Sequence, residues 1–359
     1  MAEKKAAVAM SGGVDSSLAA WLLKDAGYEV IGVHLKLWAD PNYEDNIATL
    51  KQTCAALDIP LHELNLEAEF QSRVIDYFCR EYAQGRTPNP CPVCNQQIKF
   101  GRLLKWALDM GADYLATGHY ARVKSSPDGY RLLKAAETAK DQSYFLYSLG
   151  QGELPYLLLP LGSRSKAEAK KLAAEKGLTS PNQRESHDIC FIPDGDYRSF
   201  LARYITVEPG DITDISGRVV GKHHGLACYT VGQRQGLRLS SGERQYVLRL
   251  DTRNNRLIVG TRSQLLSHWL SARELSWVAG KPPPNQSEIT AKIRYQAQEA
   301  RAKLNLNASK ATVEFYQPQS AVTPGQAVVF YQGDTVLGGG IIEESQTTRQ
   351  GSDETKAEG

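Results

Sequence analysis

The chain has 359 residues, of which 42% are hydrophobic and 23% are charged, and its formal net charge is +2. This composition is typical of a globular protein with two or three domains, and it excludes a low-complexity chain. Because the net charge is nearly neutral, an RNA partner would have to be bound by local basic patches rather than by a global field.

The first strand follows a short polar start, without a signal-peptide pattern, and no apolar run reaches the length of a membrane span. The sequence therefore predicts a cytoplasmic protein with no membrane association. Six cysteines in so long a chain are too few for a disulfide framework. In a reducing compartment they indicate redox, metal or catalytic chemistry.

Strand and helix patterns alternate along the first 200 residues or so. The apolar run Ala6–Met10 predicts the first strand, and a helix is expected over Ser16–Asp25. Further strands are expected at Tyr28–Trp38, Pro60–Leu66 and Tyr114–Thr117, with helices over Glu44–Leu57, Ala68–Tyr82 and Ile98–Met110. This alternation predicts an α/β fold with a doubly wound parallel sheet and helices on both of its faces.

A glycine-rich turn, Ser11–Ser17, joins the first strand to the first helix. Glycines let the backbone approach an anion closely, and the amides at a helix start favour negative charge. The Gly-Lys-Ser/Thr ending of a Walker A loop is absent. The turn therefore indicates a different phosphate-binding loop, and the alternative is a turn that serves only packing. Ligands of such sheets bind beyond the carboxyl ends of the strands, where this turn is expected.

The pattern changes after about residue 205. Short runs that alternate polar and apolar residues predict antiparallel sheets or a small barrel, at Arg256–Val259, Glu288–Tyr295, Lys303–Leu306, Thr312–Tyr316 and Ala327–Tyr331. We therefore predict a nucleotide-binding domain over 1–204, a small mostly-β central domain over 205–268 and a C-terminal β-barrel over 269–345. The polar residues 346–359 predict a disordered tail.

Two cysteine sites suggest chemistry. Cys91 and Cys94 form a Cys-x-x-Cys placed at the start of the expected Ile98–Met110 helix, and Cys190 lies between two apolar residues. A thiolate near a helix start or beside a cation gains acidity and hence reactivity. A zinc site would need a second ligand pair, which the sequence lacks. The remaining cysteines are interpreted as small buried hydrophobic residues: Cys54, Cys79 and Cys228.

Seven segments occur in an order that resembles one enzyme family. They are Ser11–Ser17, Asn89–Gly101, Ala116–Tyr120, Lys140–Leu146, Asp188–Ile192, Tyr229–Gly236 and Thr323–Gln326. Together they are similar to the bacterial-type tRNA-specific 2-thiouridylases, which belong to the pyrophosphate-loop ATPases. The resemblance implies an adenine-nucleotide alpha hydrolase-like domain, a central adaptor domain and a tRNA-contacting β-barrel.

The resemblance also implies the reaction. ATP would adenylate the C2 oxygen of the wobble uridine (position 34), pyrophosphate would leave, and sulfur would come from a persulfide on Cys190. Cys94 would finish as a disulfide with Cys190, and the products would be 2-thiouridine and AMP. Mg²⁺ would accompany ATP. The residues implied for ATP are Ala9, Met10, Ser11, Gly12, Gly13, Val14, Asp15, Ser16, Leu35 and Gly118.

The implied partners are tRNAs of the Lys, Glu and Gln type and an upstream persulfide donor, such as a cysteine desulfurase or a relay protein. A monomer is expected. Proteins recognise anticodon bases by splaying them out, stacking them on side chains and hydrogen-bonding to their edges. Lys and Arg side chains contact the phosphate backbone of the RNA. The residues implied for RNA contact are Asn89, Pro90, Cys91, His119, Lys140, Asp141, Gln142, Arg294, Tyr295 and Gln326.

One position departs from the family pattern. The family often has an acidic residue three positions before its first catalytic cysteine, and here that position is Cys91. His119 or a water molecule would then act as the general acid or base. A [4Fe–4S] cluster held by Cys91, Cys94 and Cys190 is an alternative to the persulfide–disulfide cycle. The sequence is also compatible with a different pyrophosphate-loop enzyme, such as an amide-forming or tRNA lysidine-forming ligase, and with a non-catalytic iron–sulfur or RNA-binding protein.

Overall fold

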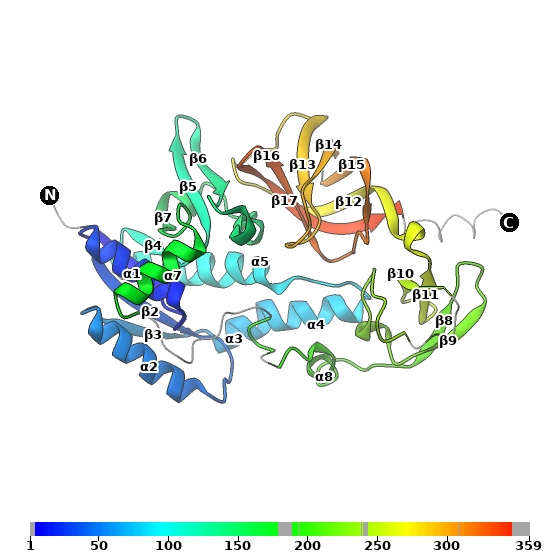
Figure 1. The fold of residues 1–359 in the computed structure, drawn as a ribbon, viewed down its shortest axis with the longest axis horizontal. Coiled ribbons are helices and arrows are strands. Elements are labelled where there is room, and N and C mark those ends of the chain that lie inside the picture. The colour runs from blue at the N-terminus through cyan, green and yellow to red at the C-terminus, as the bar shows by residue number, and fades with distance from the viewer. Residues whose placement is uncertain are drawn as a thin grey trace.

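A computed structural model describes residues 4–178, 189–192, 194–237, 239, 243–307 and 309–346. Figure 1 shows an N-terminal α/β domain at one end of the molecule, a β-barrel and a small β domain at the other, and long helices running between them. Confirming the predicted fold class, the parallel sheet comes first and the mostly-β parts follow. The predicted tail lies outside the described residues from 347 onwards, and the exact domain boundaries stay predictions.

The N-terminal sheet has five parallel strands in the order β3-β2-β1-β4-β7. Ala6 and Val8 of β1 pack into one hydrophobic cluster, and Ala7 packs into the cluster on the opposite face. Both faces are therefore buried, which explains why the strand reads as a continuous apolar run. The strands are β1 (Lys5–Ala9), β2 (Glu29–Lys36), β3 (Leu61–Asn65), β4 (Tyr114–Ala116) and β7 (Leu157–Leu158).

Helices cover both faces of this sheet, as predicted. One face packs against α1 (Val14–Asp25), α2 (Tyr43–Ala56) and α7 (Lys166–Glu175). The other face packs against the end of a long helical stretch that consists of α5 (Pro90–Cys94), the π-helix η2 (Asn95–Leu103) and α6 (Leu104–Asp109). A second stretch contains α3 (Glu67–Phe70), the π-helix η1 (Gln71–Ile75) and α4 (Asp76–Ala83).

The helix predicted from Ile98 begins earlier, at Pro90. The Asn89 side chain accepts a hydrogen bond from the Cys91 amide at 3.0 Å, and Pro90 occupies the first helical position. An Asn cap followed by Pro is a strong helix start. Cys91 and Cys94 therefore lie within the helical stretch and not ahead of it.

A β-hairpin leaves the N-terminal domain and extends the barrel sheet. It consists of β5 (Ala121–Ser126) and β6 (Gly129–Lys134), and β6 pairs with the barrel strand β17 (Thr335–Ser345). The sequence analysis did not predict this hairpin. The short 3-10 helices are η3 (Thr138–Lys140), η4 (Ser143–Leu146), η5 (Leu154–Tyr156), η6 (Leu226–Cys228) and η7 (Arg262–Leu265).

The C-terminal half contains the two predicted β units. The central domain has a four-stranded sheet in the order β10-β11-β8-β9, and the barrel closes through the pairing of β12 with β17. The central elements are α8 (Tyr197–Leu201), β8 (Gly210–Thr213), β9 (Val219–His223), β10 (Tyr246–Asp251) and β11 (Arg256–Gly260). The barrel strands are β12 (Leu266–Trp277), β13 (Ser287–Lys292), β14 (Ala300–Asn307), β15 (Lys310–Ser320), β16 (Ala327–Gln332) and β17 (Thr335–Ser345).

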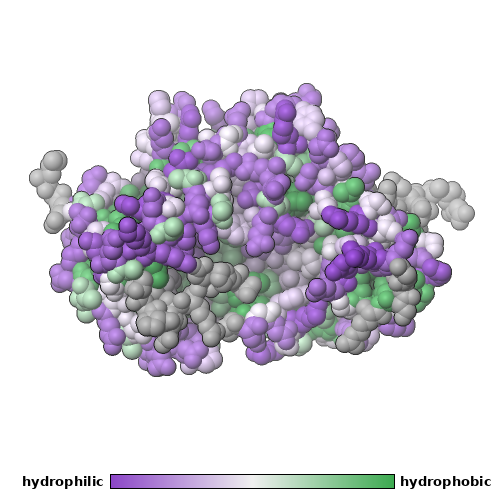
Figure 2. Space-filling view, viewed as in Figure 1, coloured by the Kyte–Doolittle hydropathy of each residue, from purple (hydrophilic) through white to green (hydrophobic). Residues whose placement is uncertain are grey.

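The surface of the molecule is mostly hydrophilic in the view of Figure 2. Figure 2 shows hydrophilic side chains over most of one face, with hydrophobic side chains visible near its middle. Across the described ranges, no helix is both long and apolar enough to cross a membrane.

Cys54 and Cys79 are buried as predicted, whereas Cys228 is only half-buried, because it lies at the edge of the central domain's core.

Candidate active site

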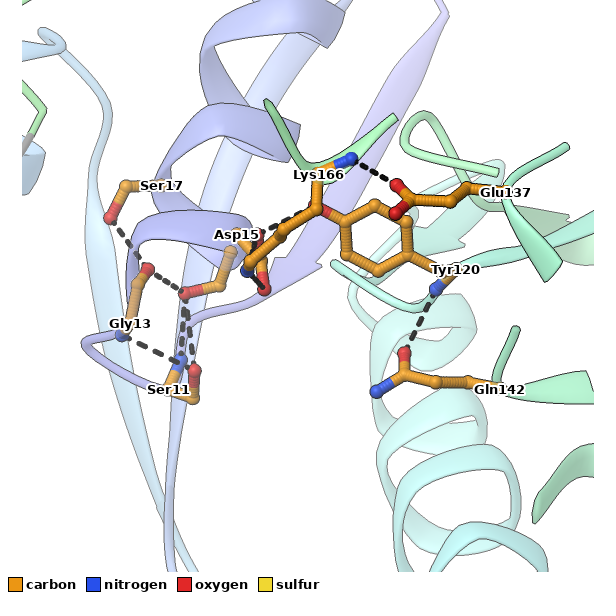
Figure 3. Close-up of polar contacts among 9 residues, drawn as sticks. Ser11, Gly13, Asp15, Ser17, Tyr120, Glu137, Gln142 and Lys166 are labelled. Atoms are coloured by element: carbon orange, nitrogen blue, oxygen red, sulfur yellow. Dashed lines mark hydrogen bonds and ion pairs between the residues drawn. The ribbon is translucent and has the colours of Figure 1, made fainter. Parts of the chain in front are cut away.

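The glycine-rich turn follows β1 and leads into α1. Gly13 is the N-cap of α1, and Gly12 has φ +80, in the left-handed region that favours glycine. No atom lies within 4 Å of a Cβ added at Gly12, so the turn borders open space. The Ser16 hydroxyl donates to the Gly13 carbonyl at 2.9 Å and accepts from the Ser11 amide at 3.2 Å. These bonds, drawn in Figure 3, hold the loop in an open curve at a helix start, where an anion fits.

Asp15, in the first turn of α1, is the centre of a polar network. The Lys166 ammonium contacts both Asp15 carboxylate oxygens, at 2.8 and 2.6 Å, and the Tyr120 hydroxyl donates to Oδ1 at 2.9 Å. The Lys166 amide donates to the Glu137 carboxylate at 2.5 Å. Figure 3 shows Lys166 and Tyr120 converging on Asp15 beside the loop. Sequence reasoning missed Lys166, although the Ser165–Glu168 capping box at the start of α7 marks its position.

Leu35 and Gly118 lie on either side of the loop. Leu35 is near the end of β2, and Gly118 follows β4; β1 pairs with both strands. The three segments therefore meet at the carboxyl edge of the sheet, and the strand order changes direction between β1 and β4, where ligands bind in such folds. A Cβ at Gly118 would lie 2.8 Å from the Asp15 carbonyl carbon. Gly118 thus permits close packing against the start of α1.

The fold brings Cys190 to the helical stretch that carries Cys91 and Cys94. Phe191 packs edge-on against Phe70 and Phe78, with ring centroids 5.6 and 5.5 Å apart. Phe191 and Cys94 belong to the same hydrophobic cluster. Cys94 is buried, Cys91 is half-buried and Cys190 is exposed. The neighbouring Asp188 lies outside the described residues.

The thiols are not activated in this conformation, contrary to the prediction from their helix position. Burial raises the pKa of Cys91 to about 11 and also raises the pKa of Cys94. Crowding by protein raises the pKa of Cys190 to about 12 even though its side chain reaches solvent, and the charges of Cys94 and Cys91 add to the effect. Desolvation therefore outweighs the helix start, and the thiols are protonated at neutral pH.

An iron–sulfur cluster does not fit the thiols as they stand. In the part of the chain that the structure describes, no group of three His, Cys, Asp or Glu side chains has the arrangement to hold a metal ion. No reaction step is therefore derived through a cluster.

His119 lies between the nucleotide loop and the π-helix η2, which follows Cys94. It follows Gly118, its Nδ1 lies 2.7 Å from the Thr117 hydroxyl, and its ring lies 5.8 Å from the Phe100 ring of η2. Burial lowers the pKa of His119 well below its usual value, and the Lys99 charge acts in the same direction. The imidazole is therefore neutral at pH 7, so it is a poor general acid in this state.

The segment Lys140–Gln142, implied for RNA contact, is tied into the N-terminal domain. Asp141 is buried and accepts from the Ala135 amide at 2.9 Å and from the Ser143 hydroxyl at 2.8 Å. The Gln142 side chain accepts from the Tyr120 amide at 2.9 Å. Asp141 therefore shapes this turn, while Lys140 is half-buried at its edge.

The residues implied for RNA contact in the barrel lie at its junction with the N-terminal domain. The Arg294 guanidinium donates to the Ala321 carbonyl, and the Tyr295 ring lies 4.4 Å from the Phe145 ring. The Gln326 amide donates to the Thr87 carbonyl at 2.7 Å, just before the helix that carries Cys91. These residues and Asn89, Pro90 and Cys91 thus lie on both sides of one domain junction.

Comparisons with known proteins agree with this architecture. Family profiles match residues 4–194 (tRNA methyl transferase HUP domain), 198–261 (tRNA methyl transferase PRC-barrel domain) and 267–342 (Aminomethyltransferase beta-barrel domain). The chain is 46% identical to the tRNA-specific 2-thiouridylase MnmA of Roseiflexus castenholzii, covering 94% of this chain and 99% of the relative. It is 47% identical to the MnmA of Moorella thermoacetica, covering 94% and 98%. The chain therefore belongs to the tRNA-specific 2-thiouridylase family.

Proposed function

We propose that this tRNA sulfurtransferase uses ATP to convert the wobble uridine of tRNA to 2-thiouridine, with Cys94 and Cys190 as its reactive sulfurs. The observation that supports the proposal is that Phe191, next to Cys190, packs in the same hydrophobic cluster as Cys94, although the two cysteines are 96 positions apart. Leu35, near the end of β2, packs against this cluster as well. A uracil C2 carbonyl is a poor site for substitution until its oxygen is activated, and the fold supplies both an anion-binding loop and thiols.

The sequence of steps follows from this chemistry. The C2 oxygen attacks the α-phosphorus of ATP and pyrophosphate leaves. The terminal persulfide sulfur on Cys190 then attacks C2, and AMP leaves. Cys94 loses its proton and attacks the Cys190 sulfur, so that the S–S bond to the transferred sulfur breaks and a Cys94–Cys190 disulfide forms. In the alternative order, Cys94 attacks first and the released sulfide attacks C2. Either order requires a reductant for the next turnover.

The nucleotide site would be formed by the turn from Ala9 to Ser16, with Leu35 and Gly118 at its sides. Mg²⁺, accompanying ATP, would neutralise phosphate charge, and the Asp15 carboxylate would offer it an oxygen ligand. Asp15 contacts Lys166, so cation binding would compete with that ion pair. Cytoplasmic location and a monomeric state remain predictions, as does the identity of the persulfide donor.

The test is thiolation of a transcript with a wobble uridine by iron-free protein supplied with ATP and a persulfide donor. Wild type is expected to form 2-thiouridine and to release pyrophosphate only when this tRNA is present. Cys94→Ser and Cys190→Ser should each lose at least about a thousandfold in thiolation, because each lacks one sulfur of the redox pair. Cys228→Ser, which changes a cysteine outside the cluster, is the matched control.

Three results would contradict parts of the proposal. Full activity of either serine variant would favour an amide-forming or lysidine-forming ligase, which needs no thiol pair. Pyrophosphate release without tRNA, or none at all, would remove the proposed adenylation. Activity that appears only after reconstitution with iron and sulfide, and disappears in Cys91→Ser, would favour the cluster-dependent reaction.

A further inference from the structure

The helical stretch that carries Cys94 changes its winding directly after that residue. Residues Asn95–Leu103 form a π-helix between the α-helices α5 and α6. Such segments are rare and are usually found at functional sites. In an α-helix, residues five positions apart point about 140° away from each other. The wider π turn reduces this angle, so Lys99, five positions after Cys94, rotates toward the cysteine's side of the helix.

Gly101 accommodates the wide turn. A Cβ added at Gly101 would lie only 2.8 Å from the backbone oxygen of Gln96, five residues earlier. Such a contact forces the backbone to shift, because a carbonyl oxygen in a helix cannot move aside freely. Glycine at this position therefore permits the winding that places Lys99. An alanine there would disturb the turn without removing the lysine.

The residues on either side of Lys99 anchor the backbone there. Ile98 is fully buried and Phe100 is 2% exposed, which anchors the backbone on either side. Lys99 itself is half-buried, and within the described residues it makes no hydrogen bond or ion pair with an acidic group. Its charge lowers the pKa of Cys91, Cys94 and Cys190 against the larger effect of burial, and it is the charged group acting on Cys94.

The other titratable groups near this helical stretch come from neighbouring elements, and Tyr144 interacts with Cys91. His119, on the loop after β4, is neutral because burial lowers its pKa. Tyr144 of η4 is fully buried, and burial raises its pKa well above the usual value. Neither supplies a charge at neutral pH. A cation is therefore needed wherever a sulfur in this crowded site becomes an anion.

We propose that Lys99 is a positioning residue for sulfur transfer, whose ammonium, delivered by the π-helical turn, stabilises the thiolate that attacks from Cys94. This rests on the proposed function and deepens it. Lys99 forms no covalent bond. The Cys94 proton leaves to water, the sulfur anion pairs with Lys99, and the charge passes to the transferred sulfur when the Cys94–Cys190 bond forms.

The test measures thiol reactivity rather than turnover. Full-length, iron-free protein is treated with iodoacetamide between pH 7 and pH 10, and mass spectrometry follows Cys94 and Cys190 separately. In Lys99→Met, alkylation of Cys94 at pH 8 should be roughly tenfold slower and its profile should move to higher pH. Lys99→Arg should restore most of the rate. Gly101→Ala should resemble Lys99→Met although the lysine is present.

Lys105→Met is the matched control, since it removes an exposed lysine from α6 of the same helical stretch and should leave the rates unchanged. Screening supplies a second measurement on wild type: added salt should slow Cys94 alkylation. Unchanged profiles in Lys99→Met, or equal effects of Lys99→Met and Lys105→Met, would overturn the proposal. The pH profile of Cys94 alkylation could depend on Lys99 in a protein that never thiolates tRNA. That result would support the effect of Lys99 on the Cys94 thiol and refute the proposed function instead.

Discussion

At the scale of single residues, the nucleotide loop is governed by one carboxylate and its partners. Asp15 lies in the first turn of α1, where the helix start favours a negative charge, and the proposed function puts the ATP phosphates at the same place. Lys166 balances the carboxylate: its side chain is 14% exposed, and it lies 5.4 Å from the Tyr120 ring centroid. An ammonium held in this position can pair with the Asp15 carboxylate, and it can pair with phosphate oxygens when ATP binds.

Lys166→Met should therefore weaken ATP binding. With the ammonium removed, the Asp15 carboxylate is unbalanced and repels the phosphates, and affinity should fall roughly tenfold. Calorimetric titration with ATP and Mg²⁺ measures the effect. Lys171→Met, at an exposed position on the same helix, should bind ATP like wild type. Equal affinity in Lys166→Met would show that Lys166 serves only the packing of α7.

At the scale of elements, the site depends on how closely the loop after β4 approaches α1. The loop after β4 passes α1 at Gly118, with no room for a side chain. The same loop leads to His119, whose ring lies near Phe100 of η2, and to Tyr120, which donates to Asp15. One glycine contact thus fixes the spacing between the start of α1 and the loop that packs against η2.

Gly118→Ala should cost about 1–3 kcal/mol of stability, because the added methyl group meets the Asp15 backbone. ATP binding should weaken as well, since α1 must shift at its first turn. Urea unfolding and ATP titration give the two values. Gly152→Ala provides the comparison, because nothing lies within 4 Å of a Cβ there, and it should be nearly neutral. A Gly118→Ala protein with wild-type stability would contradict the close approach.

At the scale of the whole molecule, a buried carboxylate joins the N-terminal domain to the barrel. The Glu81 side chain of α4 is 5% exposed and pairs with Arg86 at 2.5 Å and with Arg273 of β12 at 3.5 Å. Nearby, Thr87 donates its amide to the Pro324 carbonyl at 2.9 Å, and Gln326 donates to Thr87. The barrel is therefore anchored at the residues that precede the helix of Cys91 and Cys94.

Glu81→Gln should destabilise the protein by about 3 kcal/mol, because two arginines are left near a buried, uncharged amide. The loss should show in urea unfolding and in faster proteolysis at the junction. Glu175→Gln, which breaks the exposed pair with Lys171, should cost no more than about 0.5 kcal/mol. Similar stabilities of the two variants would mean that the junction does not depend on Glu81.

The sequence alone determined the features that local patterns encode. The Ser11–Ser17 turn, the α/β alternation, the later β texture and the family resemblance all depend on neighbouring residue types, and the fold class and family are confirmed. The Asn89–Pro90 helix start is also a local pattern, but the sequence prediction begins this helix too late, at Ile98. The individual site residues stay predictions, because their roles depend on ligands.

Only the tertiary structure decided which distant groups meet. Lys166 reaches Asp15 across 151 positions, the β5–β6 hairpin joins the barrel, and Phe191 brings Cys190 to the helix of Cys94. The protonated state of the thiols was likewise beyond sequence reasoning. A helix start lowers a thiol pKa locally, whereas burial raises it through atoms supplied by the whole fold, and here burial is the stronger effect.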